Sequence, residues 1–142
     1  MMIDGLRSSD TALTTVLGYY KAFNAGDLEG MLAYLTEDVA HDVNQGTRQV
    51  GKAAFREFLA RMNRCYREQL KDIVVMASPD ADRAAAEYVV HGTYLATDEG
   101  LPPARGQLYV LPGGAFFDLR EGRICRVSNY YNLQDWLRQV GG

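Results

Sequence analysis

The sequence predicts an α+β domain in which a cone-shaped, curved antiparallel sheet wraps around N-terminal helices and a short helix closes the C-terminus. Apolar residues recur at helical spacing in the first half of the chain and alternate with polar residues in the second half. The last stretch reads as a strand, a tight turn at 120–123, a strand, and a helix capped by Asn132. Helices packed on one face of such a sheet leave room for a conical pocket.

Length and composition place the chain among single-domain globular proteins. Its 142 residues suffice for one domain spanning 1–142, with an expected ordered core over about 8–140. The net charge of −3 argues against non-specific nucleic-acid binding, and no apolar run has the length of a membrane span. Cys65 and Cys125 lack the spacing of metal or redox motifs. We therefore expect a cytoplasmic protein with reduced cysteines.

The helices are predicted from caps and apolar stripes. The first is expected to start from a cap within residues 8–10 and to stop at 24–26. The second starts at Asp27, and the third covers 52–66. Aromatic residues that recur at this helical spacing pack in the protein core more often than they line a ligand site.

The remaining segments predict strands and one long loop. The loop 96–105 is long enough to form a lid or a rim, and Pro112-Gly113-Gly114 predicts a bulge or bend. The expected strands cover 39–44, 70–77, 84–95, 107–111, 115–119 and 123–131. Alternation places Tyr88 and Tyr94 on one face of their strand and His91 on the other. His91 is thus expected to face away from the pocket.

The densest polar cluster on a predicted strand is His41-Asp42-Val43-Asn44. Alternation sends Asp42 and Asn44 to one face and His41 and Val43 to the other. If the pocket takes Asp42, desolvation raises the pKa of its carboxyl into the range of a general base. The alternative is that Asp42 satisfies a backbone turn near Gly46. His41 is either an acid–base group or a buried structural histidine.

The order of elements and several motifs resemble the nuclear transport factor 2-like superfamily, in particular its SnoaL-like and ketosteroid isomerase-related branch. The likeness lies in residues 19–38 with Phe23-Asn24-Ala25-Gly26-Asp27, in Gly51-Lys52-Ala53-Ala54-Phe55, and in Gly100-Leu101-Pro102-Pro103 with the closing hairpin and helix. It spans nearly the whole chain. It implies a cystatin-like cone and a homodimer paired through the outer face of the sheet, with His91 at that interface. It says less about chemistry, because this fold hosts isomerases, cyclases, dehydratases, hydrolases and binding modules.

Ketosteroid isomerase, an enzyme that relies on tuned pKa values, uses an Asp base, a Tyr donor and a protonated Asp donor. The resemblance puts the Tyr position on Tyr19. It puts the base on Asp42 when counted back from Gly51, and on Val43 when counted forward from Asp38. Tyr19 would then donate a hydrogen bond to the developing enolate oxygen.

Two further acids of the family have no counterpart in this sequence. The protonated Asp position falls at about Ala115, and the last-strand acid of SnoaL-like cyclases corresponds to Asn129. These two departures favour a non-catalytic ligand-binding or dimerisation module as the alternative function. A dehydratase that uses His41 or His91 is a third possibility.

The leading expectation is a cofactor-free isomerase or cyclase that moves a proton next to a carbonyl of a small cyclic or polyketide-like substrate. Asp42 is expected as the base and Tyr19 as the donor, with His41 and Asn44 orienting the substrate. No metal or cofactor is expected, because no metal-binding spacing appears. The partner would be a small apolar or aromatic metabolite. The residues expected to contact it are Asn44, Phe23, Phe58, Met62, Tyr88, Tyr94, Phe117 and Asn129.

Overall fold

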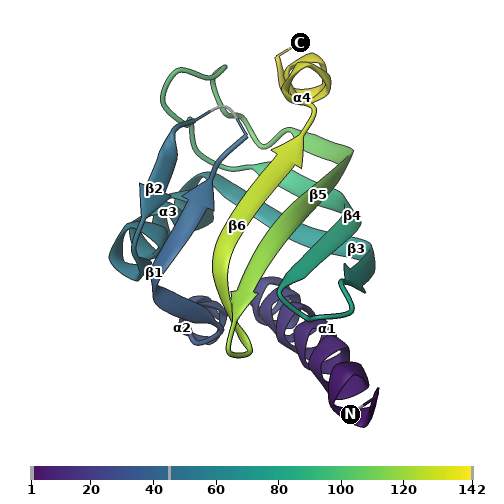
Figure 1. The fold of residues 1–142 in the computed structure, drawn as a ribbon. Coiled ribbons are helices and arrows are strands. Elements are labelled where there is room, and N and C mark those ends of the chain that lie inside the picture. Colours follow the sequence, from purple (N-terminus) through teal and green to yellow (C-terminus); the bar gives the residue numbers. More distant parts are fainter. Residues whose placement is uncertain (1, 45, 142) are drawn as a thin grey trace.

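A curved, open sheet wraps around three helices, and the predicted α+β cone is confirmed (Figure 1). The computed structural model describes residues 2–44 and 46–141, with side chains from Ser9 onward. The elements are α1 (Met2–Asn24), α2 (Leu28–Leu32), β1 (Leu35–Asp42), β2 (Arg48–Val50), α3 (Lys52–Cys65), β3 (Tyr66–Ala77), β4 (Arg83–Tyr94), β5 (Leu108–Arg120), β6 (Arg123–Tyr131) and α4 (Leu133–Val140).

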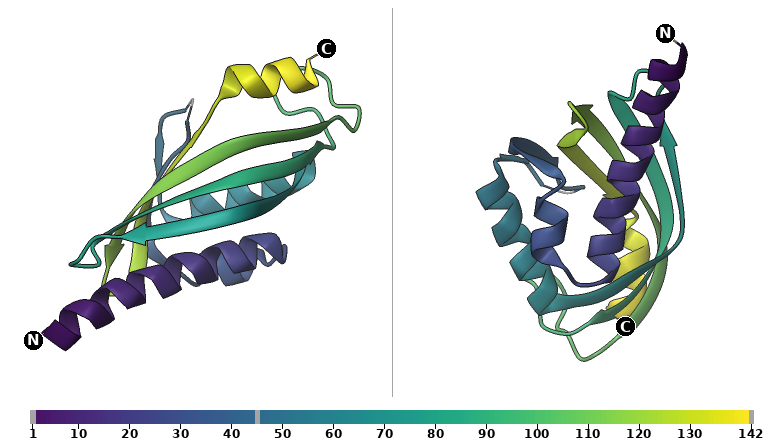
Figure 2. Two further views of the ribbon diagram at one scale, coloured as in Figure 1. Left: turned by 90° about the vertical axis from the view of Figure 1, so that its right-hand side faces the viewer. Right: turned by 90° about the horizontal axis from the view of Figure 1, so that it is seen from below.

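The sheet has the strand order β2-β1-β6-β5-β4-β3. Neighbouring strands are antiparallel except for β1 and β6, which run parallel. Figure 2 shows the long strands curving around α1, α2 and α3 on the concave side, while α4 lies across one end. The concave face therefore carries the core and leaves the opposite face of the sheet open.

The helical hairpin forms where the sequence predicts it. Ala12, Val16 and Tyr20 of α1 are buried at four-residue spacing, so this face of the helix packs on the sheet. Gly26 has a φ of +70°, a left-handed conformation that glycine adopts without a Cβ penalty, and it ends the first helix. The side chain of Asp27 then caps α2 by accepting a hydrogen bond from the backbone N–H of Gly30.

The side chain of Asn24 fixes the end of α1 to the sheet. Its Nδ2 donates to the carbonyl of Leu70, and its Oδ1 accepts from the N–H of the same residue, at 2.9 and 2.8 Å. The amide thereby pairs with both backbone groups of Leu70, as a neighbouring strand would. This contact holds β3 against the helix and sets the position of the residues around it.

Several details differ from the sequence prediction. β1 and β3 begin at Leu35 and Tyr66, each four residues before the expected start. α1 begins at Met2, ahead of the expected cap at residues 8–10. The short strand β2 was not predicted, because its residues are all exposed and carry no apolar alternation. The segment 112–114 does not interrupt the ladder as a bulge: Pro112, Gly113 and Gly114 pair in register with β4 inside one continuous strand.

The glycines of the sheet make room for tyrosine rings. A Cβ on Gly113 would lie 2.8 Å from Cε1 of Tyr88, and a Cβ on Gly92 would lie 2.2 Å from Cζ of Tyr109. Each tyrosine therefore lies across a glycine of the neighbouring strand. The absence of a side chain at these positions allows a large ring to cross the concave face.

The last helix closes one end of the cone. Gln139 of α4 pairs with Val110 of β5 through an amide: its Oε1 accepts from the N–H and its Nε2 donates to the carbonyl, each at 2.9 Å. Trp136 points inward and is 5% exposed. Among the described residues, no helix combines the length and the apolar character that crossing a membrane requires.

Candidate functional site

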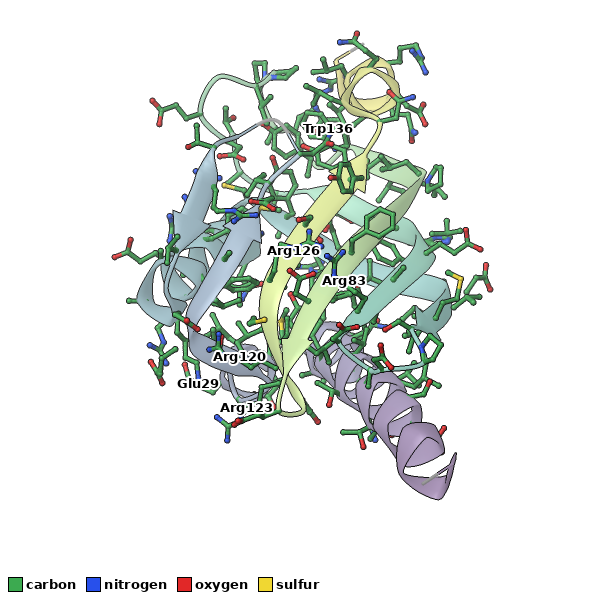
Figure 3. All side chains as sticks on the ribbon, in the orientation of Figure 1. Glu29, Arg83, Arg120, Arg123, Arg126 and Trp136 are labelled. Atoms are coloured by element: carbon green, nitrogen blue, oxygen red, sulfur yellow. The ribbon has the colours of Figure 1, made fainter. Side chains whose placement is uncertain are left out.

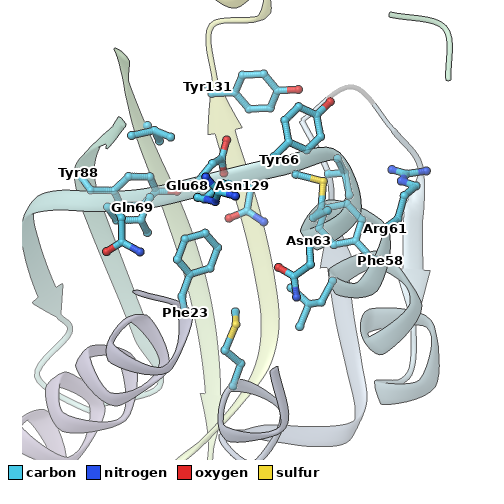
Figure 4. Close-up of a pocket in the computed structure, with 18 of the residues that line it drawn as sticks. Phe23, Phe58, Arg61, Asn63, Tyr66, Glu68, Gln69, Tyr88, Asn129 and Tyr131 are labelled. Carbon is cyan, nitrogen blue, oxygen red and sulfur yellow. The ribbon is translucent and has the colours of Figure 1, made fainter. Parts of the chain in front are cut away.

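A pocket of about 490 Å³ opens within the concave face of the sheet. This volume lies within the usual range of small-molecule sites. Figure 4 shows Phe23, Phe58 and Tyr88 around it, with Glu68 and Asn129 pointing into the space between them. The pocket therefore combines mainly aromatic and aliphatic walls with a smaller set of polar side chains, which is the arrangement of a small-molecule site.

Glu68 of β3 places a carboxyl group inside this pocket. It occupies an inward position between Tyr66 and Leu70, which alternation brings to the same face. Burial raises the pKa of Glu68, although a hydrogen bond from Tyr109 acts in the opposite direction. A carboxyl whose pKa is raised toward neutrality both accepts and returns a proton efficiently, as general acid–base catalysis requires.

The hydroxyl of Tyr109 donates this hydrogen bond to Oε2 of Glu68, with a separation of 2.5 Å. The two residues are on β5 and β3, and Gly92 of β4 stands opposite both in the register. Burial and the nearby Glu68 carboxyl raise the pKa of Tyr109, so its hydroxyl stays protonated. Tyr109 is therefore a hydrogen-bond donor throughout the neutral pH range.

A second polar group in the pocket is the pair of His41 and Asn129, whose Nε2 and Nδ2 atoms lie 3.2 Å apart. His41 is 1% exposed and packs between Phe55 and Phe58, with ring centroids 4.5 Å away in both cases. Burial lowers the pKa of His41 to about 4. The imidazole is thus neutral at physiological pH, as expected for a buried histidine without a carboxylate partner.

Tyr19 lies on the pocket wall contributed by α1, as expected. It packs edge-on against Tyr20 and Phe117, with ring centroids 5.3 and 6.0 Å away. Burial raises the pKa of Tyr19, so its hydroxyl is protonated and can donate a hydrogen bond. The structure thus brings Tyr19, His41 and Glu68 to one cavity.

Asp42 lies on the opposite face of the sheet, because alternation turns His41 and Val43 toward the pocket instead. Its carboxylate accepts two hydrogen bonds from Arg48, at 2.7 and 3.0 Å, and one from Ser128 at 2.6 Å. The Arg48 hydrogen bond is the main reason that the pKa of Asp42 falls to about 2. Such a carboxylate is a weak base, and it is separated from the ligand space by the sheet.

Of the residues expected to contact a ligand, five line the pocket: Phe23, Phe58, Met62, Tyr88 and Asn129. Asn44 is not among the lining residues, and its Nδ2 donates to the carbonyl of Tyr131. Tyr94 and Phe117 are also absent from the lining and are fully buried in the core. Tyr94 instead supports the loop that follows β4, since its hydroxyl donates to the carbonyl of Pro102.

His91 does not share the pocket with His41. It is exposed on the outer face of β4, as alternation predicts. The structure therefore does not bring the two histidines together at one ligand site. Among residues 2–44 and 46–141, no cluster of at least three histidine, cysteine or acidic side chains is arranged to hold a metal ion.

The loop after β4 contributes Asp98 to the rim of the pocket. The Asp98 carboxylate accepts a hydrogen bond from the hydroxyl of Tyr66 at 2.8 Å and lies 3.7 Å from Arg61. Its own N–H donates to the hydroxyl of Tyr94 at 3.0 Å. These contacts hold the loop over the pocket, consistent with the rim or lid expected from its length.

Glu68, Tyr109 and Asp98 were not identified from the sequence as site residues. One signal for Glu68 was present: in Tyr66-Arg67-Glu68-Gln69-Leu70 an acid takes the same face as an aromatic and an aliphatic residue. An acid on an apolar strand face indicates a buried carboxyl. The signal lies outside the predicted strand, which starts at residue 70, whereas β3 begins four residues earlier at Tyr66.

Comparisons with known proteins identify the family of this chain and relatives with the same fold. The sequence profile of the SnoaL-like domain matches residues 16–127. A solved structure of a proposed polyketide cyclase from Pseudomonas putida KT2440 is 64% identical, with a TM-score of 0.90 over 91% of this chain and 97% of that chain. Another proposed polyketide cyclase, from Silicibacter sp. TM1040, is 60% identical, with a TM-score of 0.92 over 94% and 98% of the two chains.

More distant structures share the fold alone. A nuclear transport factor 2-like protein from Burkholderia pseudomallei K96243 is 17% identical, with a TM-score of 0.74 over 93% of this chain and 98% of that chain. The search of curated proteins gives no significant match. Since the family profile matches residues 16–127, well over half of the chain, this chain belongs to the SnoaL-like family.

Proposed function

We propose that this protein is an isomerase- or cyclase-type enzyme that moves a proton next to a carbonyl of a small cyclic, polyketide-like substrate. The observation that carries the proposal is the Glu68 carboxyl, which lies in an aromatic pocket with its pKa raised by burial. The relatives described as proposed polyketide cyclases support the same class of substrate. The reaction needs only side chains of the pocket.

In this mechanism Glu68 is the base, a role that we assign to it in place of Asp42. Its carboxylate takes a proton from the carbon next to the carbonyl, and the C–H electron pair forms the enolate. Tyr19 donates a hydrogen bond to the enolate oxygen, where negative charge develops. Glu68 then returns the proton to a carbon of the substrate and is ready for another cycle.

The His41–Asn129 pair orients the ligand. Because His41 is neutral and packed between phenylalanine rings, it adds polarity to the wall without adding charge. The amide of Asn129 retains a second N–H and a carbonyl for a ligand group. Both residues line the same pocket as Glu68.

The test is hydrogen exchange at the α-carbon of small bicyclic ketones such as 2-tetralone, followed by NMR in D₂O. We expect the wild-type protein to accelerate exchange and Glu68→Gln to lose about 10²- to 10⁴-fold of that acceleration. Glu87→Gln, a change of an exposed glutamate on β4, is the matched control and should retain it. Acceleration that survives Glu68→Gln would contradict the assignment.

A non-catalytic ligand-binding module is the second candidate. It is favoured by Ala115 and Asn129, which stand where the resemblance implies acids and offer no ionisable group. The chain has a single tryptophan, Trp136, and it lines the pocket, so its fluorescence reports binding directly. Saturable quenching by the bicyclic ketones without any exchange would favour this candidate over the enzyme.

We also propose that two copies pair through the outer face of the sheet. Val110, Phe116 and Tyr130 are 50–53% exposed there, which is unusual for large apolar side chains on one face. Figure 3 shows Arg83 and Arg126 on this face over β5 and β6. Both contact Asp118, at 3.1 and 2.9 Å, so the surface carries charges of both signs that a second copy can complement.

Light scattering tests the dimer. Phe116→Glu places a charge in the centre of the apolar surface and should shift the mass toward the monomer. Arg64→Glu, an exposed change on α3 away from the sheet, should leave the mass unchanged. A Phe116→Glu protein that keeps the wild-type mass over a dilution series would contradict pairing through this face.

A further inference from the structure

Three residues that are far apart in the sequence form one row across the sheet. Glu68 of β3 stands opposite Gly92 of β4, and Gly92 stands opposite Tyr109 of β5. The Tyr109 side chain crosses the middle strand and its hydroxyl reaches Oε2 of Glu68. A hydrogen bond thus joins strands that are not neighbours, across the strand between them.

This contact depends on the missing side chain at Gly92. A Cβ there would lie 2.2 Å from Cζ, 2.3 Å from Cε2 and 2.5 Å from the hydroxyl oxygen of Tyr109. Any residue other than glycine would displace the tyrosine ring from its path. Gly92, Tyr109 and Glu68 are therefore one structural unit on the wall of the pocket.

The hydrogen bond also makes the two oxygens of the carboxyl unequal. Oε2 of Glu68 is held by Tyr109, whereas Oε1 has no hydrogen-bond partner among residues 9–44 and 46–141. We propose that Tyr109 is the positioning residue of this site: it anchors Oε2, so that Oε1 is the atom that exchanges the proton with the substrate. This inference rests on the acid–base role proposed above for Glu68.

The proton balance of the step is simple. Oε1 of the ionised carboxyl forms an O–H bond with the hydrogen leaving the substrate carbon, and the electron pair of that C–H bond becomes the enolate π-bond. Tyr109 keeps its own proton, because burial and the Glu68 charge raise its pKa. Tyr109 thus acts on the substrate only through Glu68.

A measurable consequence follows from the difference between the two protonation states. A hydroxyl donates a stronger hydrogen bond to a carboxylate than to a carboxylic acid, so Tyr109 favours the ionised form of Glu68. Without Tyr109 the effect of burial is unopposed, and the pKa of Glu68 should rise further. Loss of such a bond corresponds to an upward shift of about 1–2 pH units.

The experiment is a ¹³C NMR titration of glutamate carboxyl carbons, with Glu68→Gln identifying the Glu68 signal. Tyr109→Phe keeps the ring and removes only the hydroxyl, and it should move the Glu68 titration upward by about 1–2 pH units. Tyr34→Phe removes a hydroxyl from a residue outside the pocket lining and should leave the titration in place. The rate of α-hydrogen exchange in Tyr109→Phe should acquire the same shifted pH dependence.

The two proposals can fail separately. A Glu68 titration that does not move in Tyr109→Phe overturns the positioning role, whatever the protein catalyses. Exchange that persists in Glu68→Gln overturns the proposed function, even where the titration shifts as expected. Gly92→Ala gives a second route to the same result: the displaced Tyr109 should release Glu68 and raise its titration as Tyr109→Phe does. If the Glu68 titration is unchanged in folded Gly92→Ala protein, the proposed dependence of Glu68 on Gly92 and Tyr109 is wrong.

Discussion

The ring of Tyr109 covers Gly92 so closely that a Cβ at position 92 would lie 2.2 Å from Cζ of the tyrosine. Gly92→Ala should therefore destabilise the protein by about 1–3 kcal/mol, the usual cost of overpacking a buried site. The same change in a Tyr109→Val background should cost much less, because the ring is gone. Urea unfolding of the four proteins of this double-mutant cycle measures the difference. Equal costs in both backgrounds would show that the ring is not the obstacle.

Asp42→Asn is expected to retain activity, in contrast to Glu68→Gln. Asp42→Asn should leave α-hydrogen exchange unchanged, because the carboxylate lies on the outer face and is paired with Arg48. The same change should lower the free energy of unfolding by about 0–1 kcal/mol, since the ion pair is partly exposed. Loss of exchange in a folded Asp42→Asn protein, at wild-type ligand affinity, would return the base role to Asp42.

The contribution of Asp42 to the free energy of unfolding also depends on pH in a defined way. The pKa of Asp42 is lowered to about 2, mainly by Arg48, so its ionised form is favoured in the folded state. This stabilisation is present above the ordinary aspartate pKa and disappears as the pH falls toward 2. Unfolding curves of wild-type and Asp42→Asn protein should therefore converge at low pH.

The burial of His41 predicts a second pH dependence of stability, at higher pH than that of Asp42. Its folded-state pKa is about 4, because burial disfavours the charged imidazole, whereas an unfolded histidine titrates near its ordinary value of about 6.5. Between these values the unfolded state binds more protons, so stability should fall as the pH drops from about 6.5 to about 4. Across this whole pH range the loss in the free energy of unfolding is about 3 kcal/mol.

His41→Gln should remove this slope, whereas His91→Gln should keep it, because His91 is exposed on the outer face. Urea unfolding at several pH values between 4 and 7 compares the three proteins. Parallel pH profiles for wild-type and His41→Gln would show that His41 is already accessible to protons in the folded state.

The fold could be predicted from the sequence because its main signals are local. Apolar spacing identified α1 and α3, and the Asp27 cap identified the start of α2. The signals failed where tertiary contacts decide the structure. Pro112-Gly113-Gly114 predicts a break by its composition, but the Tyr88 ring fills the space above Gly113 and the strand continues.

The site could be predicted only in part, for a related reason. Strand alternation correctly separated His41 from Asp42, yet it cannot state which of the two faces is concave. That choice depends on how the sheet curves around the helices. The row of Glu68, Gly92 and Tyr109 depends on the register of three strands, and no local pattern encodes that register.

Two amide side chains that tie helices to strand backbones provide a matched pair. Asn24 binds both backbone groups of Leu70 in a partly buried setting, and Gln139 binds both groups of Val110 in an exposed one. Asn24→Asp and Gln139→Glu each keep the acceptor for the backbone N–H and lose the donor to the carbonyl. Each also places a negative charge beside that carbonyl oxygen.

The two changes should differ in size because an unsatisfied buried group costs more than one that water can reach. We expect Asn24→Asp to lower the free energy of unfolding by about 1–3 kcal/mol and Gln139→Glu by less than about 1 kcal/mol. Asn24→Asp should also weaken quenching of Trp136 by bicyclic ketones, because Leu70 is two residues from Glu68 on β3. Urea unfolding and fluorescence titration of both variants test this order, and a larger loss for Gln139→Glu would reverse it.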